Sequence, residues 1–128
     1  MKYRTDGPFV ILTTTGEDTD AERKVVYDAI QSDPKVRDGA YLIIDLRKYA
    51  VRLTPAELQD RLSALLGTLG KRIALACAVI VGNTSLRFGL SLQLAAGNMN
   101  FRVAVFHDEA SARSWLKTFA TYLQDQKK

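Results

Sequence analysis

The chain has 128 residues, 47% of them apolar and 25% charged, which is typical of one globular domain that buries its own core. No apolar run approaches the roughly 18 residues of a membrane-spanning helix, and the first residues lack the apolar stretch of a signal peptide. The net charge is +4, but acidic residues interrupt every long basic stretch, which argues against a nucleic-acid partner. The single cysteine, Cys77, cannot form an internal disulfide. We therefore expect a single domain over residues 1–128, located in the cytoplasm.

The first elements along the chain are two short strands, expected over residues 2–5 and 9–14. They are separated by Asp6-Gly7-Pro8, in which Asp-Gly is a hairpin turn signal because glycine adopts positive φ at little cost. An N-terminal hairpin is the expected result.

A first helix is predicted to begin near Thr19. Thr19 and Glu22 have the spacing of a capping box, in which each side chain accepts a hydrogen bond from a free backbone N–H. The helix should end at Asp33, because the residue before a proline avoids helical geometry. Its apolar side is expected to hold Ala21, Val25 and Ala29, with Val26 and Ile30 beside them.

Residues 41–46 are almost wholly apolar, which predicts a central strand buried on both faces and interrupted only by Asp45. A second helix should follow, with Thr54 as its cap, Pro55 in its first turn and Glu57 completing a capping box. Its buried stripe is expected to consist of five leucines, namely Leu58, Leu62, Leu65, Leu66 and Leu69.

Residues 74–81 predict a second central strand, but residues 85–96 are ambiguous. Their apolar side chains alternate as in a strand and also form pairs four residues apart as in a helix. We predict a helix with Gly97 as its C-terminal cap, because two buried parallel strands need a crossover connection between them. If these residues instead formed a strand in a meander, the predicted architecture would be wrong.

The chain should end with a strand over residues 101–106 and a helix capped by Asp108. The apolar side of this helix is expected to carry Ala112, Trp115, Leu116, Phe119 and Leu123, with residues 124–128 as a polar tail. The predicted fold class is therefore α/β, a mixed sheet with an N-terminal hairpin and about four helices.

Three stretches resemble the STAS domain, the fold of bacterial anti-sigma-factor antagonists. They are Thr15-Gly-Glu-Asp-Thr-Asp-Ala-Glu22 before the first helix, Tyr41-Leu-Ile-Ile-Asp-Leu46 in the central strand, and the ending from Val105-Phe-His-Asp-Glu-Ala110 to Trp115-Leu116. The last stretch resembles the divergent SpoIIAA-like branch. The resemblance covers residues 2–123 and implies a small regulatory domain that acts by binding.

The resemblance also implies a position for a regulatory phosphate. Signalling members carry a phosphorylated serine, within Asp-Ser-Ser-Gly, at the start of the helix after the central strand. Thr54 is the only hydroxyl residue at the equivalent place here, with Leu53 in place of the acidic residue and Pro55 following. The phosphorylation motif is thus degenerate, and we expect Thr54 to act as a helix cap.

Ligands of open α/β sheets collect beyond the carboxyl ends of the parallel strands, and scattered polar residues fall there. Candidates for binding a ligand or an anion are Asp45, Asn83, Thr84, Arg87 and His107. A free helix N-terminus beside Arg87 suits an anion, but we favour the interpretation that Asn83 or Thr84 caps the helix and Arg87 points to water. Neither Cys77 nor His107 has the neighbours that a metal site or a nucleophilic centre needs.

We therefore expect a cytoplasmic module that is not an enzyme and needs no cofactor or metal, binding a protein or a small ligand. The alternative is a carrier of an apolar or lipid-like molecule, with Leu66, Leu69, Leu90 and Leu94 lining its cavity. An enzyme using Asp45 or His107 is a third possibility. An exposed face of the third or fourth helix could also support a homodimer.

Overall fold

The computed structural model describes residues 1–126, with the backbone alone for residues 75 and 120–126. The elements follow the order β1 (Lys2–Asp6), β2 (Phe9–Thr13), α1 (Asp20–Ser32), β3 (Ala40–Leu46), α2 (Pro55–Leu69), β4 (Ile73–Val81), α3 (Leu86–Gly97), β5 (Arg102–Phe106) and α4 (Glu109–Gln126). The predicted α/β class is confirmed, including the N-terminal hairpin and the helix after β4.

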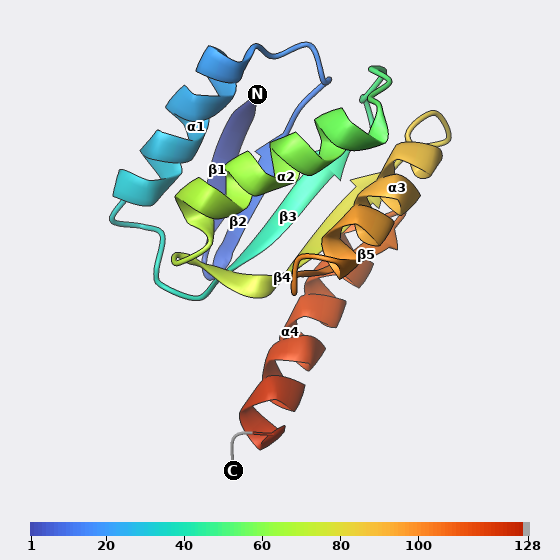
Figure 1. Cartoon of the computed structure of the whole chain (residues 1–128). Helices are drawn as coiled ribbons and strands as arrows, with labels where there is room; N and C mark the ends of the chain where they lie inside the picture. Colours follow the sequence, from blue (N-terminus) through green and yellow to red (C-terminus); the bar gives the residue numbers. More distant parts are fainter. Residues whose placement is uncertain (127–128) are drawn as a thin grey trace.

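The five strands form one mixed sheet in the order β1-β2-β3-β4-β5. Only β1 is antiparallel to its neighbour, and the two-residue turn between Asp6 and Phe9 contains Gly7 at φ +57°. The other strands are parallel, and Thr13, Asp45, Ile80 and Phe106 lie in register across them. All four parallel strands consequently end at the same edge of the sheet (Figure 1).

Helices cover both faces of the sheet, as Figure 1 shows. Helices α1, α2 and α3 pack side by side on one face, and their buried residues join one apolar cluster that includes Val10, Leu42 and Val79. Helix α4 packs on the other face, where Ala112 and Leu116 contact a second cluster around Ile43. Residues of β3 alternate between the two clusters, which explains why its sequence is apolar throughout.

The buried side of α1 differs from the prediction. Val25 is 69% exposed, and Ala21 and Ala29 are exposed as well, whereas Arg23, Tyr27 and Ile30 face the core. The space between α1, α2 and the sheet is filled by the long stems of Arg23 and Tyr27, which a short alanine side chain does not reach. Ile30 is buried and Val26 is half-buried, as predicted, so the hydrophobic pattern identified only part of the buried side.

Three predicted ends are also corrected. Ser85, and neither Asn83 nor Thr84, is the residue at the N-cap of α3, and its hydroxyl accepts a hydrogen bond from the Gly82 N–H instead of capping the helix. Gly97 is the last helical residue, and Asn98 is the C-cap. Helix α4 continues through residues 124–126 of the predicted tail. Residues 127–128 and the side chain of Leu123 lie outside what the structure describes.

Candidate ligand site

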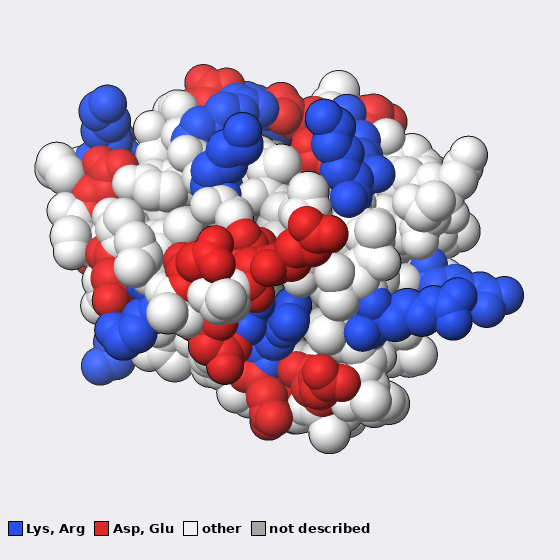
Figure 2. All heavy atoms as spheres, turned by 90° about the horizontal axis from the view of Figure 1, so that it is seen from above, with Lys and Arg blue, Asp and Glu red and all other residues white. Residues whose placement is uncertain are grey.

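The residues predicted from the sequence lie along the carboxyl edge of the sheet, but they do not form one site. Asn83, Thr84, Arg87 and His107 are exposed, and Asp45 is partly buried. Within residues 1–126, no hydrogen bond or ion pair joins any two of these five. Figure 2 looks onto this edge and shows acidic side chains gathered near the middle of the face, with basic side chains around them.

Asp45 is held by its neighbour Arg47. Its carboxylate accepts bonds from the Arg47 backbone N–H at 3.1 Å, from Nε at 3.0 Å and from Nη2 at 2.7 Å. Burial raises the pKa of Asp45, but these bonds and the positive charge of Arg47 outweigh it and leave the pKa below its ordinary value. An ionised and paired carboxylate of this kind is a poor proton carrier.

Thr54 and Asp108 both act as helix caps, as predicted. The Thr54 hydroxyl accepts from the Glu57 N–H at 3.2 Å, and the Glu57 carboxylate accepts from the Thr54 N–H at 3.1 Å, which completes a capping box. Asp108 accepts from the Ser111 N–H at 2.7 Å. These side chains are therefore used in stabilising the starts of α2 and α4.

A better candidate for a binding site is a cavity of about 60 Å³ between the sheet and the three helices α1, α2 and α3. Its walls are mostly apolar and come from Leu12, Ile44, Leu46, Leu58, Leu62, Leu65, Phe88 and Leu92. Its polar lining residues are Thr14, Asp18, Arg23, Tyr27, Tyr49 and Arg61, with Met1 at the rim. An apolar cavity with a few polar groups directed into it is the usual form of a small-molecule site.

Tyr49 supplies an unpaired hydroxyl to this cavity. The residue is 3% exposed, and its hydroxyl oxygen is buried without any hydrogen-bond partner among the described residues. The ring is fixed on one side by Phe88, with centroids 4.1 Å apart, and on the other by Gly16. A Cβ at Gly16 would lie 2.5 Å from Tyr49 Cε2, so only glycine permits this approach.

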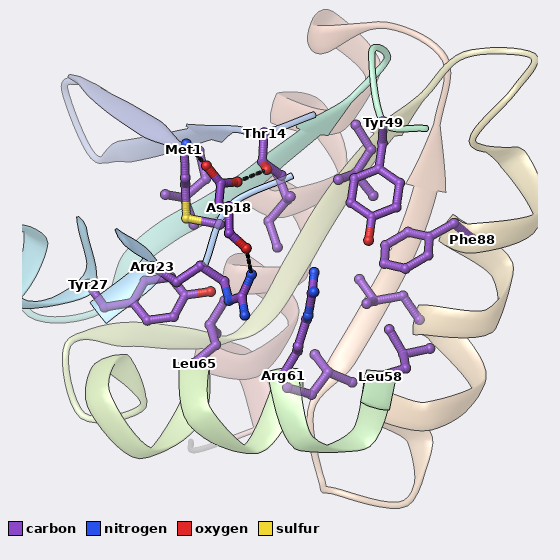
Figure 3. Close-up of a pocket in the computed structure, with 15 residues that line it drawn as sticks. Met1, Thr14, Asp18, Arg23, Tyr27, Tyr49, Leu58, Arg61, Leu65 and Phe88 are labelled. Carbon is purple, nitrogen blue, oxygen red and sulfur yellow. Dashed lines mark hydrogen bonds and ion pairs between the residues drawn. The ribbon is translucent and has the colours of Figure 1, made fainter. Parts of the chain in front are cut away.

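Arg61 reaches the cavity from α2. Figure 3 shows its guanidinium and the Tyr49 hydroxyl pointing toward each other. Arg61 forms no ion pair or hydrogen bond with any residue that the structure describes. Its half-buried position and unpaired charge distinguish it from the other cation of the lining, Arg23.

The remaining charges of the lining are paired. Arg23 donates to the backbone carbonyl of Asp18 and to the carboxylate of Asp20, and Asp18 accepts from the Met1 amino group and the Thr14 hydroxyl (Figure 3). Burial raises the pKa of Asp18, but these partners and the charge of Arg23 hold the pKa below its ordinary value. Asp18 is thus ionised and already satisfied.

Both tyrosines of the cavity remain neutral at physiological pH. Burial is the main cause that raises the pKa of Tyr49 and of Tyr27, and the nearby positive charges of Arg23 and Arg61 lower it only in part. Their hydroxyls are therefore available as hydrogen-bond donors.

This site was not predicted from the sequence, because its members are spread from Met1 to Leu92 and come from two strands, three helices and the loops between them. Phe88 and Leu92 reach the cavity, but Leu66, Leu69, Leu90 and Leu94, which were expected to line one, do not. Leu90 and Leu94 face outward, with 46% and 77% exposure. The isolated Tyr49 in a polar loop was the available signal.

Among the described residues, no three His, Cys, Asp or Glu side chains lie close enough to hold a metal ion. None of the helices within residues 1–126 combines the length and apolar character needed to cross a bilayer. No protein-family model, curated protein or solved structure matches the chain.

Proposed function

We propose that this chain is a non-catalytic, STAS-like regulatory module of the cytoplasm that acts by binding a small ligand in the cavity between the sheet and helices α1, α2 and α3. The order of strands and helices supports the STAS resemblance, since a hairpin is followed by alternating helices and parallel strands. The cavity gives such a module a place to hold a ligand.

The observation that carries this proposal is the Tyr49 hydroxyl, which is buried and unpaired at the wall of a cavity. Leaving a buried polar group without a partner costs about 1–3 kcal/mol, and buried hydroxyls in folded proteins nearly always have partners. A ligand that accepts this hydrogen bond would recover the cost.

A binding role is also favoured by the state of the reactive groups. Cys77 is fully buried in β4, and burial raises the pKa of its thiol, which disfavours the nucleophilic thiolate. The Asp45 carboxylate is paired with Arg47, and His107 is exposed outside the cavity.

The size of the cavity limits the ligand. The cavity has a volume of about 60 Å³ and is partly open to solvent. A carrier of lipid-like molecules would need the helices to move away from the sheet. A ligand with only a few non-hydrogen atoms fits the structure as it stands.

The proposal is tested by a thermal-shift screen of small polar molecules, run in parallel on two variants of α2. Leu62→Phe places a larger side chain in the cavity, whereas Leu66→Phe makes the same change on the same helix outside it. We expect compounds that stabilise the wild type and Leu66→Phe but not Leu62→Phe. Shifts of equal size in all three proteins, or none in any, would contradict ligand binding at this site.

A second candidate function is protein binding through an exposed leucine stripe on α3. Leu86, Leu90 and Leu94 lie at successive helical turns and are 37%, 46% and 77% exposed. Large apolar side chains gathered in this way are typical of interaction surfaces. Helix α3 is therefore apolar on two sides, with Phe88 and Leu92 directed inward.

This second function is tested with Leu90→Lys/Leu94→Lys against the control Val25→Lys, which changes an exposed apolar residue on α1. Sedimentation over a range of protein concentrations detects a homodimer, and affinity capture with the purified protein detects another partner. Association lost only in the double variant supports the stripe. Association that survives in the double variant rules the stripe out.

A further inference from the structure

We propose that the ligand of this cavity is a monocarboxylate with a short apolar tail, its carboxylate bound by Arg61 and the Tyr49 hydroxyl. This inference rests on the proposed function and adds the chemical class of the ligand. It follows from three properties of the cavity, namely its spare positive charge, its spare donors and its apolar walls.

The spare charge belongs to Arg61. Asp18 is the only carboxylate of the lining, and it is already bonded to the Met1 amino group and the Thr14 hydroxyl. The charge of Arg23 is likewise paired with Asp20. An anion entering the cavity would therefore pair with Arg61 without displacing an existing contact.

The spare hydrogen-bonding groups are donors. Arginine has no acceptor and presents two parallel N–H groups that match the two oxygens of a carboxylate. The Tyr49 hydroxyl points toward the same place (Figure 3) and keeps its proton, because burial raises its pKa. Tyr27 also lines the cavity, and no hydrogen bond joins its hydroxyl to a residue that the structure describes. Hydrogen-bond donors that have no acceptor among the lining residues favour a ligand that supplies acceptor atoms.

The apolar walls of the cavity indicate the chemistry of the rest of the ligand. Below the two polar groups, the cavity is lined by leucines of α2 and by Phe88 and Leu92 of α3. These side chains favour an alkyl tail over a polar one. The volume of about 60 Å³ restricts that tail to a few carbon atoms. Propionate and butyrate have this combination of head and tail.

The inference is tested by calorimetric titration of the full chain with acetate, butyrate, octanoate, butanol and sulfate at matched ionic strength. We expect butyrate to bind with a Kd of about a millimolar or tighter, acetate and octanoate to bind more weakly, and butanol and sulfate to bind at least tenfold more weakly. Acetate lacks the apolar tail, octanoate exceeds the cavity, butanol lacks the charge and sulfate lacks the apolar group.

Two variants with matched controls assign the head group. Arg61→Gln should weaken butyrate binding about tenfold or more, whereas Arg52→Gln, which makes the same change at an exposed position before α2, should leave it unchanged. Tyr49→Phe should weaken binding about threefold to tenfold, and Tyr41→Phe, outside the cavity, should not.

The stability of Tyr49→Phe also distinguishes a tyrosine that binds ligand from one that only supports the fold. Because the hydroxyl is buried without a partner, its removal should raise the urea midpoint of the ligand-free protein or leave it unchanged. The same variant should lose ligand affinity. A lowered midpoint would show that the hydroxyl is bonded in the free protein, and the inference would be wrong.

The failure of this inference is distinguishable from the failure of the proposed function. If butanol binds as tightly as butyrate and Leu62→Phe abolishes both, the cavity binds ligands but not through a carboxylate, and only the inference falls. If sulfate binds as tightly as butyrate, the tail is irrelevant and the inference also falls. If no compound of this panel or of the thermal-shift screen binds the wild type better than Leu62→Phe, both proposals are wrong.

Discussion

The rings of Tyr49 and Phe88 stack with centroids 4.1 Å apart and an interplanar angle of 27°. The contact joins the loop after β3 to helix α3, so two segments that are distant in the chain fix one wall of the cavity. It also holds the Tyr49 hydroxyl in a direction where no residue that the structure describes offers a partner.

Replacing Phe88 should therefore affect both stability and the position of Tyr49. Phe88→Leu keeps an apolar side chain but loses the ring, and we expect a loss of about 1 kcal/mol in the free energy of unfolding. Phe88→Ala removes most of the half-buried side chain and should cost about 3 kcal/mol. Urea denaturation measures both values, and equal losses would show that stacking contributes nothing beyond volume.

Gly16 should be intolerant of a side chain because of Tyr49. Gly16 has φ +90°, and a Cβ there would lie 2.5 Å from Tyr49 Cε2 and 2.9 Å from Val51 Cβ. We expect Gly16→Ala to lower the free energy of unfolding by about 3 kcal/mol, from backbone strain and the collision together.

The matched control for Gly16 is Gly39→Ala. Gly39 has a similar φ of +81°, but a Cβ there would meet no atom within 4 Å. Only backbone strain then applies, and the expected loss is about 1 kcal/mol. If both variants lost the same amount in urea denaturation, the close approach of Gly16 to Tyr49 would not matter for folding.

Thr54 should behave as a helix cap in stability measurements. Thr54→Ala removes the acceptor for the Glu57 N–H and should cost about 1 kcal/mol. Thr54→Ser and Thr54→Asp retain an oxygen at the same place, and both should unfold close to the wild type in urea. A loss in Thr54→Asp as large as that in Thr54→Ala would contradict the capping role.

Asp45 should contribute to the acid sensitivity of the fold. Burial raises its pKa, but the bonds from Arg47 outweigh burial, so the pKa in the folded protein lies below that of the unfolded chain. The resulting stability is present above the unfolded pKa of about 3.9 and is lost as the pH falls through the folded value. Asp45→Asn should therefore unfold with a shallower pH dependence below about pH 4.

The partner of Asp45 provides the control. In Arg47→Gln the effect of burial remains while the positive charge is gone, so the pKa of Asp45 should rise toward or above its ordinary value. Titration of the Asp45 carboxyl carbon by NMR follows this directly. An unchanged pKa in Arg47→Gln would show that another group determines it.

The strands and helices themselves were largely determined by the local sequence. Thr19 with Glu22 and Thr54 with Glu57 form the capping boxes that their three-residue spacing predicts, and Asp33-Pro34 ends α1. The apolar runs in β3 and β4 predicted central strands, and the need for a crossover between parallel strands correctly decided that α3 is a helix. These features depend on residues within a few positions of each other, which a sequence displays directly.

The site was decided by the tertiary structure alone. Tyr49 and Arg61 face each other only because β3 and α2 pack with a cavity between them, and no spacing in the chain encodes that distance. The burial of Arg23 and Tyr27 on α1 was likewise set by the space beside them, whereas the apolar pattern identified Ile30 correctly. Local hydrogen bonds and periodicity fix the elements, whereas the burial of each side chain depends on neighbours contributed by the rest of the fold.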